Sequence, residues 1–188
     1  MTNRTLGTLG MLGAPFLGIE YIIQANAGTQ DMRLAALFGI PYALGWLGCI
    51  WALYRMDAAG SSRIGRGILT VMLVLLSLAN VWDFYAAVYP SAGDLLYRIT
   101  DLSWPASNLF MLAVGVAVIR AGRLSGWRKY VPFAVGLWLP LSVLSGVLLG
   151  QGAMAAVVFS ALYSAVMWTL LGYAIRTTEE PYSLSVNS

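Results

Sequence analysis

Six apolar runs, each about 20 residues long, dominate this 188-residue sequence and leave few folds open to it. A helix of that length crosses the hydrocarbon core of a bilayer, about 30 Å thick, at 1.5 Å per residue. Only 10% of the residues are charged, against about a quarter in soluble domains. We therefore predict an all-α, polytopic membrane helix bundle of six transmembrane helices. The runs cover roughly 6–27, 34–54, 67–89, 101–119, 130–149 and 154–175.

The basic residues indicate how this bundle is oriented. With six spans, nine of the eleven Lys and Arg residues fall on one face of the membrane, and only Arg33 and Arg98 fall on the other. Because basic residues concentrate on the cytoplasmic side, we expect both termini in the cytoplasm of a cell membrane, of the bacterial inner-membrane type. The nine residues on that side are Arg4, Arg55, Arg63, Arg66, Arg120, Arg123, Arg128, Lys129 and Arg176.

The first apolar run could be a signal peptide or a membrane helix. Arg4, the apolar run and the Ala25-Asn26-Ala27 triplet are similar to a cleavable signal peptide. Glu20 interrupts that run, so we expect a first helix that stays uncleaved. The sequence thus predicts one six-helix transmembrane domain over 1–176 and a short polar cytoplasmic tail over 177–188.

The residue types that are scarce exclude several kinds of chemistry. The sequence has no histidine, which rules out zinc–histidine sites, bis-histidine haem and Ser-His or Cys-His catalysis. Its single cysteine, Cys49, cannot form an internal disulfide, and its single lysine, Lys129, lies in a basic loop. We expect no metal and no cofactor. Basic residues are spread over short loops, so we expect no nucleic-acid partner either.

Three acidic residues fall inside the predicted spans and need an explanation. They are Glu20, Asp83 and Asp101, and the predicted topology places all three toward the outer leaflet. A carboxylate at mid-bilayer costs about 2.5–3.5 kcal/mol on insertion scales, so such groups normally face a cavity or a partner.

Amide and indole side chains accompany these acids. Gln24 lies four residues after Glu20, Asn80 three before Asp83, and Asn108 seven after Asp101, spacings that put each pair on one helix face. We therefore predict an acidic ligand-binding pocket in the outer half of the membrane. Its predicted residues are Glu20, Gln24, Asn80, Trp82, Asp83, Asp101, Trp104 and Asn108.

Each acid also has a purely structural explanation. Asp101, with Thr100 beside it, has the sequence context of a helix N-cap. Asp83 lies near enough to the predicted interface to be solvated. Glu20 could pair with Arg33 or Arg98, the two outer cations, as a lock between helices.

Two further patterns concern how the helices associate. Glu20, Pro41 and Arg55 recur as Asp83, Pro105 and Arg120 at offsets of 63, 64 and 65 residues, which suggests repeated helix hairpins. A ridge of small residues in the fifth run permits close helix contact, either inside the bundle or in a homo-oligomer. This ridge consists of Ser142, Gly146 and Gly150.

These features leave three functions open. The first is binding or transport of a small ligand, a cation or a proton through the acidic pocket, which intramembrane acids favour. The second is a structural or accessory subunit whose polar residues only hold helices together. The third is an intramembrane lipid-modifying enzyme that uses carboxylates, disfavoured because the sequence shows no nucleophile–base pair and no histidine.

Overall fold

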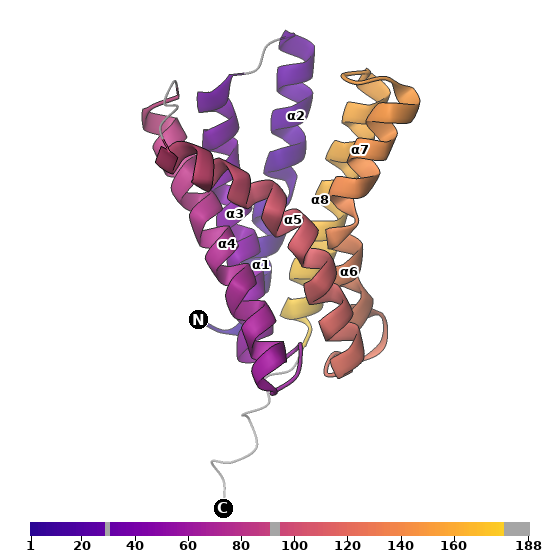
Figure 1. Cartoon of the computed structure of the whole chain (residues 1–188). Helices are drawn as coiled ribbons and strands as arrows, with labels where there is room; N and C mark the ends of the chain where they lie inside the picture. Colours follow the sequence, from indigo (N-terminus) through magenta and orange to yellow (C-terminus); the bar gives the residue numbers. More distant parts are fainter. Residues whose placement is uncertain (29–30, 91–94, 179–188) are drawn as a thin grey trace, which may run out of the picture.

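The computed structural model describes residues 1–28, 31–90 and 95–178, and every regular element in that part of the chain is helical. The last ten residues of the predicted tail, 179–188, lie outside the described residues. The elements are α1 (Asn3–Gly13), α2 (Pro15–Ala27), α3 (Met32–Arg55), α4 (Arg63–Val88), α5 (Leu95–Ala121), the 3₁₀ helix η1 (Gly126–Tyr130), α6 (Val131–Gly136), α7 (Trp138–Leu149) and α8 (Met154–Arg176). Figure 1 shows them as one bundle.

The predicted spans correspond to helices that are long and apolar enough to cross a membrane. Five such helices occur in the described residues, with α1 and α2 together forming the first, over Asn3–Ala27. The fifth predicted run, 130–149, is not one straight helix, because its two parts, Gly126–Gly136 and Trp138–Leu149, are bent by 51°. It makes a sixth span only if this bent pair crosses as a unit.

Proline explains the bend in the fifth predicted run. Pro140 has no N–H to donate to the carbonyl of Gly136, which lies four residues earlier where α6 ends. Leu137 separates the two helices, and α7 resumes with Trp138. By contrast, Pro15 stands at the first position of α2, where proline costs no helical hydrogen bond.

Glycines let α1 pack closely between α3 and α8. Gly10 lies against the Sγ atom of Cys49 in α3 and against Gly172 in α8. Gly13 and Gly45 face each other in the same way, because a Cβ on either would lie within 3.5 Å of the other's Cα. Small residues at such positions allow backbones to approach and gain van der Waals contact, the main attraction between helices in lipid. The apolar N-terminal segment is therefore built into the bundle.

Large aromatic side chains fill the centre. Trp46, Trp138 and Trp168 are each no more than 2% exposed and come from α3, α7 and α8. The rings of Trp46 and Trp168 are 5.1 Å apart, and those of Trp138 and Trp168 are 6.0 Å apart, both edge to face. These three residues pack in the core, whereas Trp51 is 46% exposed on the surface.

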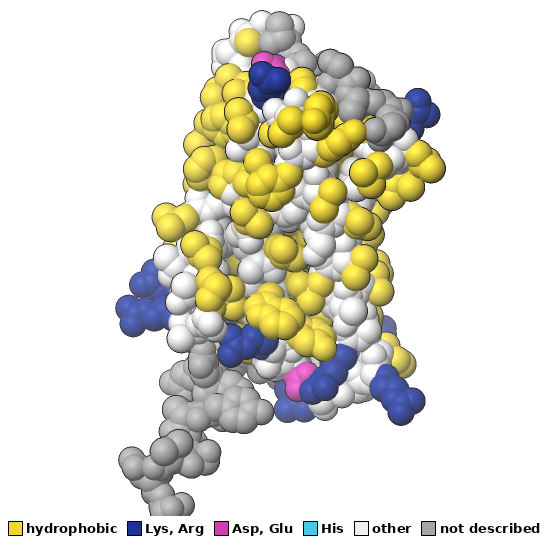
Figure 2. Space-filling view, turned by 90° about the vertical axis from the view of Figure 1, so that its left-hand side faces the viewer, with side chains coloured by type: hydrophobic (Ala, Val, Ile, Leu, Met, Phe, Trp, Pro, Cys, Tyr) yellow, Lys and Arg dark blue, Asp and Glu magenta, His cyan; other side chains and the backbone are white. Residues whose placement is uncertain are grey.

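The basic residues gather at one end of the bundle, named here the basic end. α1, α4 and η1 begin there, and α3, α5 and α8 finish there, bringing together the nine residues from Arg4 to Arg176 named above. The Arg55 guanidinium donates to the carbonyl of Met1, and Arg128 donates to the Thr177 hydroxyl. Figure 2 shows dark-blue side chains concentrated at this end and apolar side chains on the flank above it. The opposite end, where α3 starts and α4 finishes, is named the far end.

Candidate functional site

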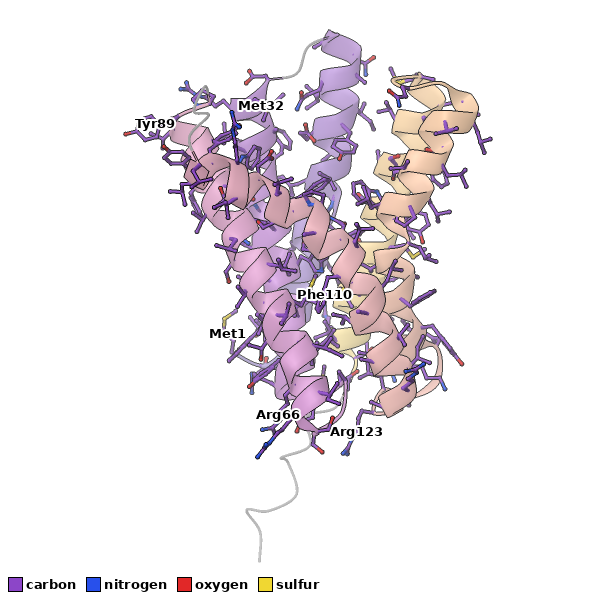
Figure 3. The ribbon with its side chains drawn as sticks, in the orientation of Figure 1. Met1, Met32, Arg66, Tyr89, Phe110 and Arg123 are labelled. Atoms are coloured by element: carbon purple, nitrogen blue, oxygen red, sulfur yellow. The ribbon has the colours of Figure 1, made fainter. Side chains whose placement is uncertain are left out.

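A cavity of about 210 Å³ lies among α2, α3, α4 and α5 in the half of the bundle toward the far end. Figure 3 locates this half by Met32 and Tyr89, opposite Arg66 and Arg123. Five of the eight predicted pocket residues line it: Glu20, Trp82, Asp83, Asp101 and Trp104. Residues far apart in the sequence thus meet at one depth. We name this space the acidic cavity; its other lining residues are Leu17, Tyr21, Ala35, Gly39 and Tyr42.

Glu20 comes from the middle of α2 and is 5% exposed. Its carboxylate accepts a hydrogen bond from the Gln24 amide, one helical turn later, as the sequence spacing predicted. The other end of the Gln24 amide accepts from the backbone N–H of Asp31, at the start of α3. Gln24 therefore orients Glu20 and links α2 and α3 at the far end, although it does not line the acidic cavity itself.

Asp83 enters the acidic cavity from α4 and is 6% exposed. It lies against Gly39 of α3, where an added Cβ would overlap its Oδ1 atom. Gly39 thus makes room for the carboxylate by having no side chain. The sequence interpretation of Asp83 as a solvated interfacial residue is wrong, because the side chain is buried against a neighbouring helix.

Asp101 is an exposed residue of α5 that also lines the acidic cavity. The sequence interpretation as a helix N-cap is wrong, because α5 begins six residues earlier, at Leu95. The neighbouring Thr100 and Ser103 hydroxyls donate to carbonyls of their own helix instead of capping it. Pro105 cannot donate a backbone hydrogen bond to the Asp101 carbonyl, so that carbonyl has no ordinary helical partner.

Four aromatic rings, from Tyr21, Tyr42, Trp82 and Trp104, line the acidic cavity beside the acids. Tyr42 is 1% exposed, and its hydroxyl has no hydrogen-bond partner among the described residues. Trp104 stands edge to face against Trp138, with ring centroids 5.5 Å apart. A buried hydroxyl normally has a partner, so Tyr42 offers a free polar contact at the cavity wall.

Asn80 and Asn108 do not line the acidic cavity. Both are buried, and each donates to a carbonyl of its own helix, Asn80 to Leu76 at 2.8 Å and Asn108 to Trp104 at 3.0 Å. Their amide oxygens have no partner among the described residues. Helical spacing placed them on the acidic faces, but local backbone bonding holds their amide groups along the helix.

Two larger cavities adjoin the acidic cavity around Tyr21. One, of about 500 Å³, is also lined by Glu20 and Gln24, and the other, of about 340 Å³, by Trp104 and Trp138.

Ser142 and Gly146, two members of the small-residue ridge of α7, line the second of these cavities. A Cβ on Gly146 would meet nothing within 4 Å, so the ridge has no close helix neighbour there. Gly150 ends α7 with φ 99°. The homo-oligomer through this ridge stays a prediction.

No basic side chain of the described residues lines the acidic cavity. Neither Arg33 nor Arg98 lines it, and the described residues show no ion pair from Glu20 to either arginine. Their one ion pair joins Arg66 and Asp57 at the basic end, 2.9 Å apart, where the hydrogen bond from Arg66 lowers the pKa of the Asp57 carboxyl. No three acidic or thiol side chains of the described residues are grouped so that they could hold a metal ion.

Sequence reasoning missed Tyr21, Gly39 and Tyr42. A signal for two of them existed, since Ala35, Gly39 and Tyr42 recur at spacings of four and three residues and so share one face of α3. Only a charged residue on that face would have drawn attention to it.

Comparison of the chain with protein-family models, with curated proteins and with solved structures finds no match.

Proposed function

We propose that this membrane-embedded chain binds or transports a small organic cation through the acidic cavity. One observation carries the proposal. Glu20, Asp83 and Asp101 line the same cavity as four aromatic rings, and no Lys or Arg does. The apolar helices support the coarser statement that the protein is integral to a membrane.

Electrostatics favour a positively charged ligand. Each carboxylate held at membrane depth costs about 2.5–3.5 kcal/mol unless a partner offsets it. The lining of the acidic cavity offers no basic partner, and of its three acids only Glu20 accepts a hydrogen bond from the Gln24 amide. A bound cation would supply the missing charge, while the faces of Trp82, Trp104 and the two tyrosines attract cations through their ring quadrupoles.

The form of the site favours an organic ammonium group over a bare metal ion. The acids are spread around the wall, and the described residues contain no trio that could hold a metal. The cavity volume of about 210 Å³ equals about seven waters at roughly 30 Å³ each, enough for a small quaternary ammonium ion. A longer ligand could extend into the 500 Å³ cavity, because Glu20 and Ala35 line both.

The topology that accompanies this proposal has six spans, with the bent pair α6–α7 as the fifth. Basic residues collect on the cytoplasmic side of membrane proteins, so the basic end would face the cytoplasm. Both termini would then be cytoplasmic, and the acidic cavity would lie toward the outer leaflet of a bacterial-type inner membrane.

Binding of tetramethylammonium to the purified chain in nanodiscs tests the proposal. We expect saturable binding, weakened at least tenfold, about 1.4 kcal/mol, by Asp83→Asn or Glu20→Gln. Asp57→Asn at the basic end is the matched control and should bind as the wild type does. Uptake of the same ion into proteoliposomes then separates transport from binding. Unchanged binding by both cavity variants, or no binding by the wild type, would refute the proposal.

The two alternatives predict different results for the same variants. A structural or accessory subunit should lose folded protein, measured by thermal unfolding, when Glu20 is neutralised. A lipid-modifying enzyme should turn over a lipid substrate and lose turnover with Asp83→Asn while remaining folded. Retention of the wild-type melting temperature with lost tetramethylammonium binding fits only the proposed function.

A further inference from the structure

A cavity of about 820 Å³ lies at the basic end, far from the acidic cavity. The start of α4 and the end of α5 form its walls. α4 and α5 lie together near the far end and diverge toward the basic end (Figure 1). The space between them is lined by apolar side chains, chiefly Ile64 and Ile68 from α4 and Leu112 and Val116 from α5.

Exposed apolar side chains line this groove. Ile64 is 76% exposed, and Ala113, which also lines the groove, is exposed as well. Leu112 precedes Arg120 by eight residues of α5, so the apolar wall runs about 12 Å from the basic end into the membrane-spanning part. Such a wall lies at the depth of the upper part of an acyl chain.

The mouth of the groove carries positive charge. Arg120, in the last turn of α5, and Arg123, just after the helix, both line it, and no acid does. The nearby Asp57 accepts two hydrogen bonds from Arg66, at 2.9 and 3.2 Å. In the described part of the chain, neither Arg120 nor Arg123 forms an ion pair, although Arg123 is near enough to Asp57 to help lower the pKa of that carboxyl. The exposed Ser61 adds a hydroxyl at the same place.

We propose that this groove binds one anionic phospholipid, with its phosphate between Arg120 and Arg123 and an acyl chain along Ile64, Ile68 and Val116. The guanidinium groups form no ion pair in the described residues and complement the lipid's charge, and basic pockets between transmembrane helices are suited to such headgroups. The 12 Å apolar wall can contact an acyl chain, whereas a soluble anion has no apolar part to place against it. The proposal is independent of the cation site at the other end.

Native mass spectrometry of the full chain in detergent micelles, with phosphatidylglycerol or phosphatidylcholine added, tests this site. We expect a one-to-one adduct with phosphatidylglycerol and a much weaker one with phosphatidylcholine. Each arginine near a membrane surface contributes about 1 kcal/mol, so the double change Arg120→Gln with Arg123→Gln should weaken phosphatidylglycerol binding roughly 25-fold. Ala113→Trp should also reduce the adduct, by filling the groove without altering its charge.

The matched control removes the same charge elsewhere at the basic end, by Arg4→Gln with Arg176→Gln. Both are exposed, and neither lines the groove. This control should leave the adduct unchanged. An equal loss in the control would reveal a general surface-charge effect and overturn the proposal. Equal binding of the two lipids, or displacement of phosphatidylglycerol by inorganic phosphate, would overturn it as well.

Discussion

Gly172→Ala tests the close contact between α1 and α8 on which the position of the N-terminal helix depends. A Cβ at Gly172 would stand 2.6 Å from the carbonyl oxygen of Gly7 and 2.7 Å from the backbone nitrogen of Met11. Ordinary contact begins at 3.4 Å. The two helices would therefore have to separate by about 0.8 Å, since backbone atoms cannot move aside as a side chain can.

The expected cost follows from this separation. Overpacking costs about 1–3 kcal/mol, and clashes with two backbone atoms of α1 place Gly172→Ala in the upper part of that range. Alanine gains up to about 1 kcal/mol in helix propensity over glycine. The net destabilisation is about 2 kcal/mol, which lowers the melting temperature of a chain of this size by about 4–8 °C.

Cys49 provides the assay. It is the only cysteine, it is 1% exposed, and it lies in the same glycine-lined contact region beside Gly10. A dye that fluoresces on reacting with a thiol should report unfolding as Cys49 becomes accessible on heating. Gly67→Ala is the control, because its Cβ would meet nothing within 4 Å, and it should melt no lower than the wild type. A wild-type melting temperature for Gly172→Ala would refute the reasoning, and so would an equal loss in Gly67→Ala.

Three further changes probe the site and the basic end. Gly39→Ala should displace the Asp83 carboxylate and weaken tetramethylammonium binding about tenfold, while the melting temperature measured by Cys49 labelling stays near that of the wild type. Unchanged binding would contradict the role given to Gly39. Tyr42→Phe removes a buried hydroxyl without a described partner, so stability should hold or rise, and a lower melting temperature would mean that the hydroxyl is paired after all. Arg66 lowers the pKa of Asp57 in the folded protein, so this pair stabilises at neutral pH and stops doing so as the pH falls through that lowered pKa. Acidification to about pH 3 should therefore lower the melting temperature of the wild type more than that of Asp57→Asn. An equal decrease in both proteins would show that the pair contributes nothing to stability.

The helix pattern follows from hydropathy because the length needed to cross a bilayer is fixed by its thickness. The predicted runs 34–54 and 154–175 lie within α3 and α8 and fall short of their ends by two residues or fewer. The fifth run deviates because hydropathy does not register the hydrogen bond that Pro140 cannot make. α5 begins before its run because the polar segment from Tyr97 to Asp101 is still helical.

The acidic cavity was partly predictable for a related reason. A carboxylate in an apolar run stands out in the sequence, so Glu20 and Asp83 were found from their position alone. Neutral residues such as Gly39 and Tyr42 look like ordinary packing, and only the arrangement of α3 against α4 shows what they touch. The hairpin repeat stays a prediction, since the paired positions were matched by sequence offset only.

Tyr21 lines all three cavities at the far-end half of the bundle. Among the described residues, Tyr21 is therefore the one lining residue that the 210 Å³ acidic cavity shares with both neighbouring spaces, of about 500 and 340 Å³. Under the proposed function, this uncharged side chain would influence which ligand sizes fit, separately from the acids that would attract a cation. The proposal then implies that substitutions at Tyr21 and substitutions at the acids would alter size preference and charge preference separately.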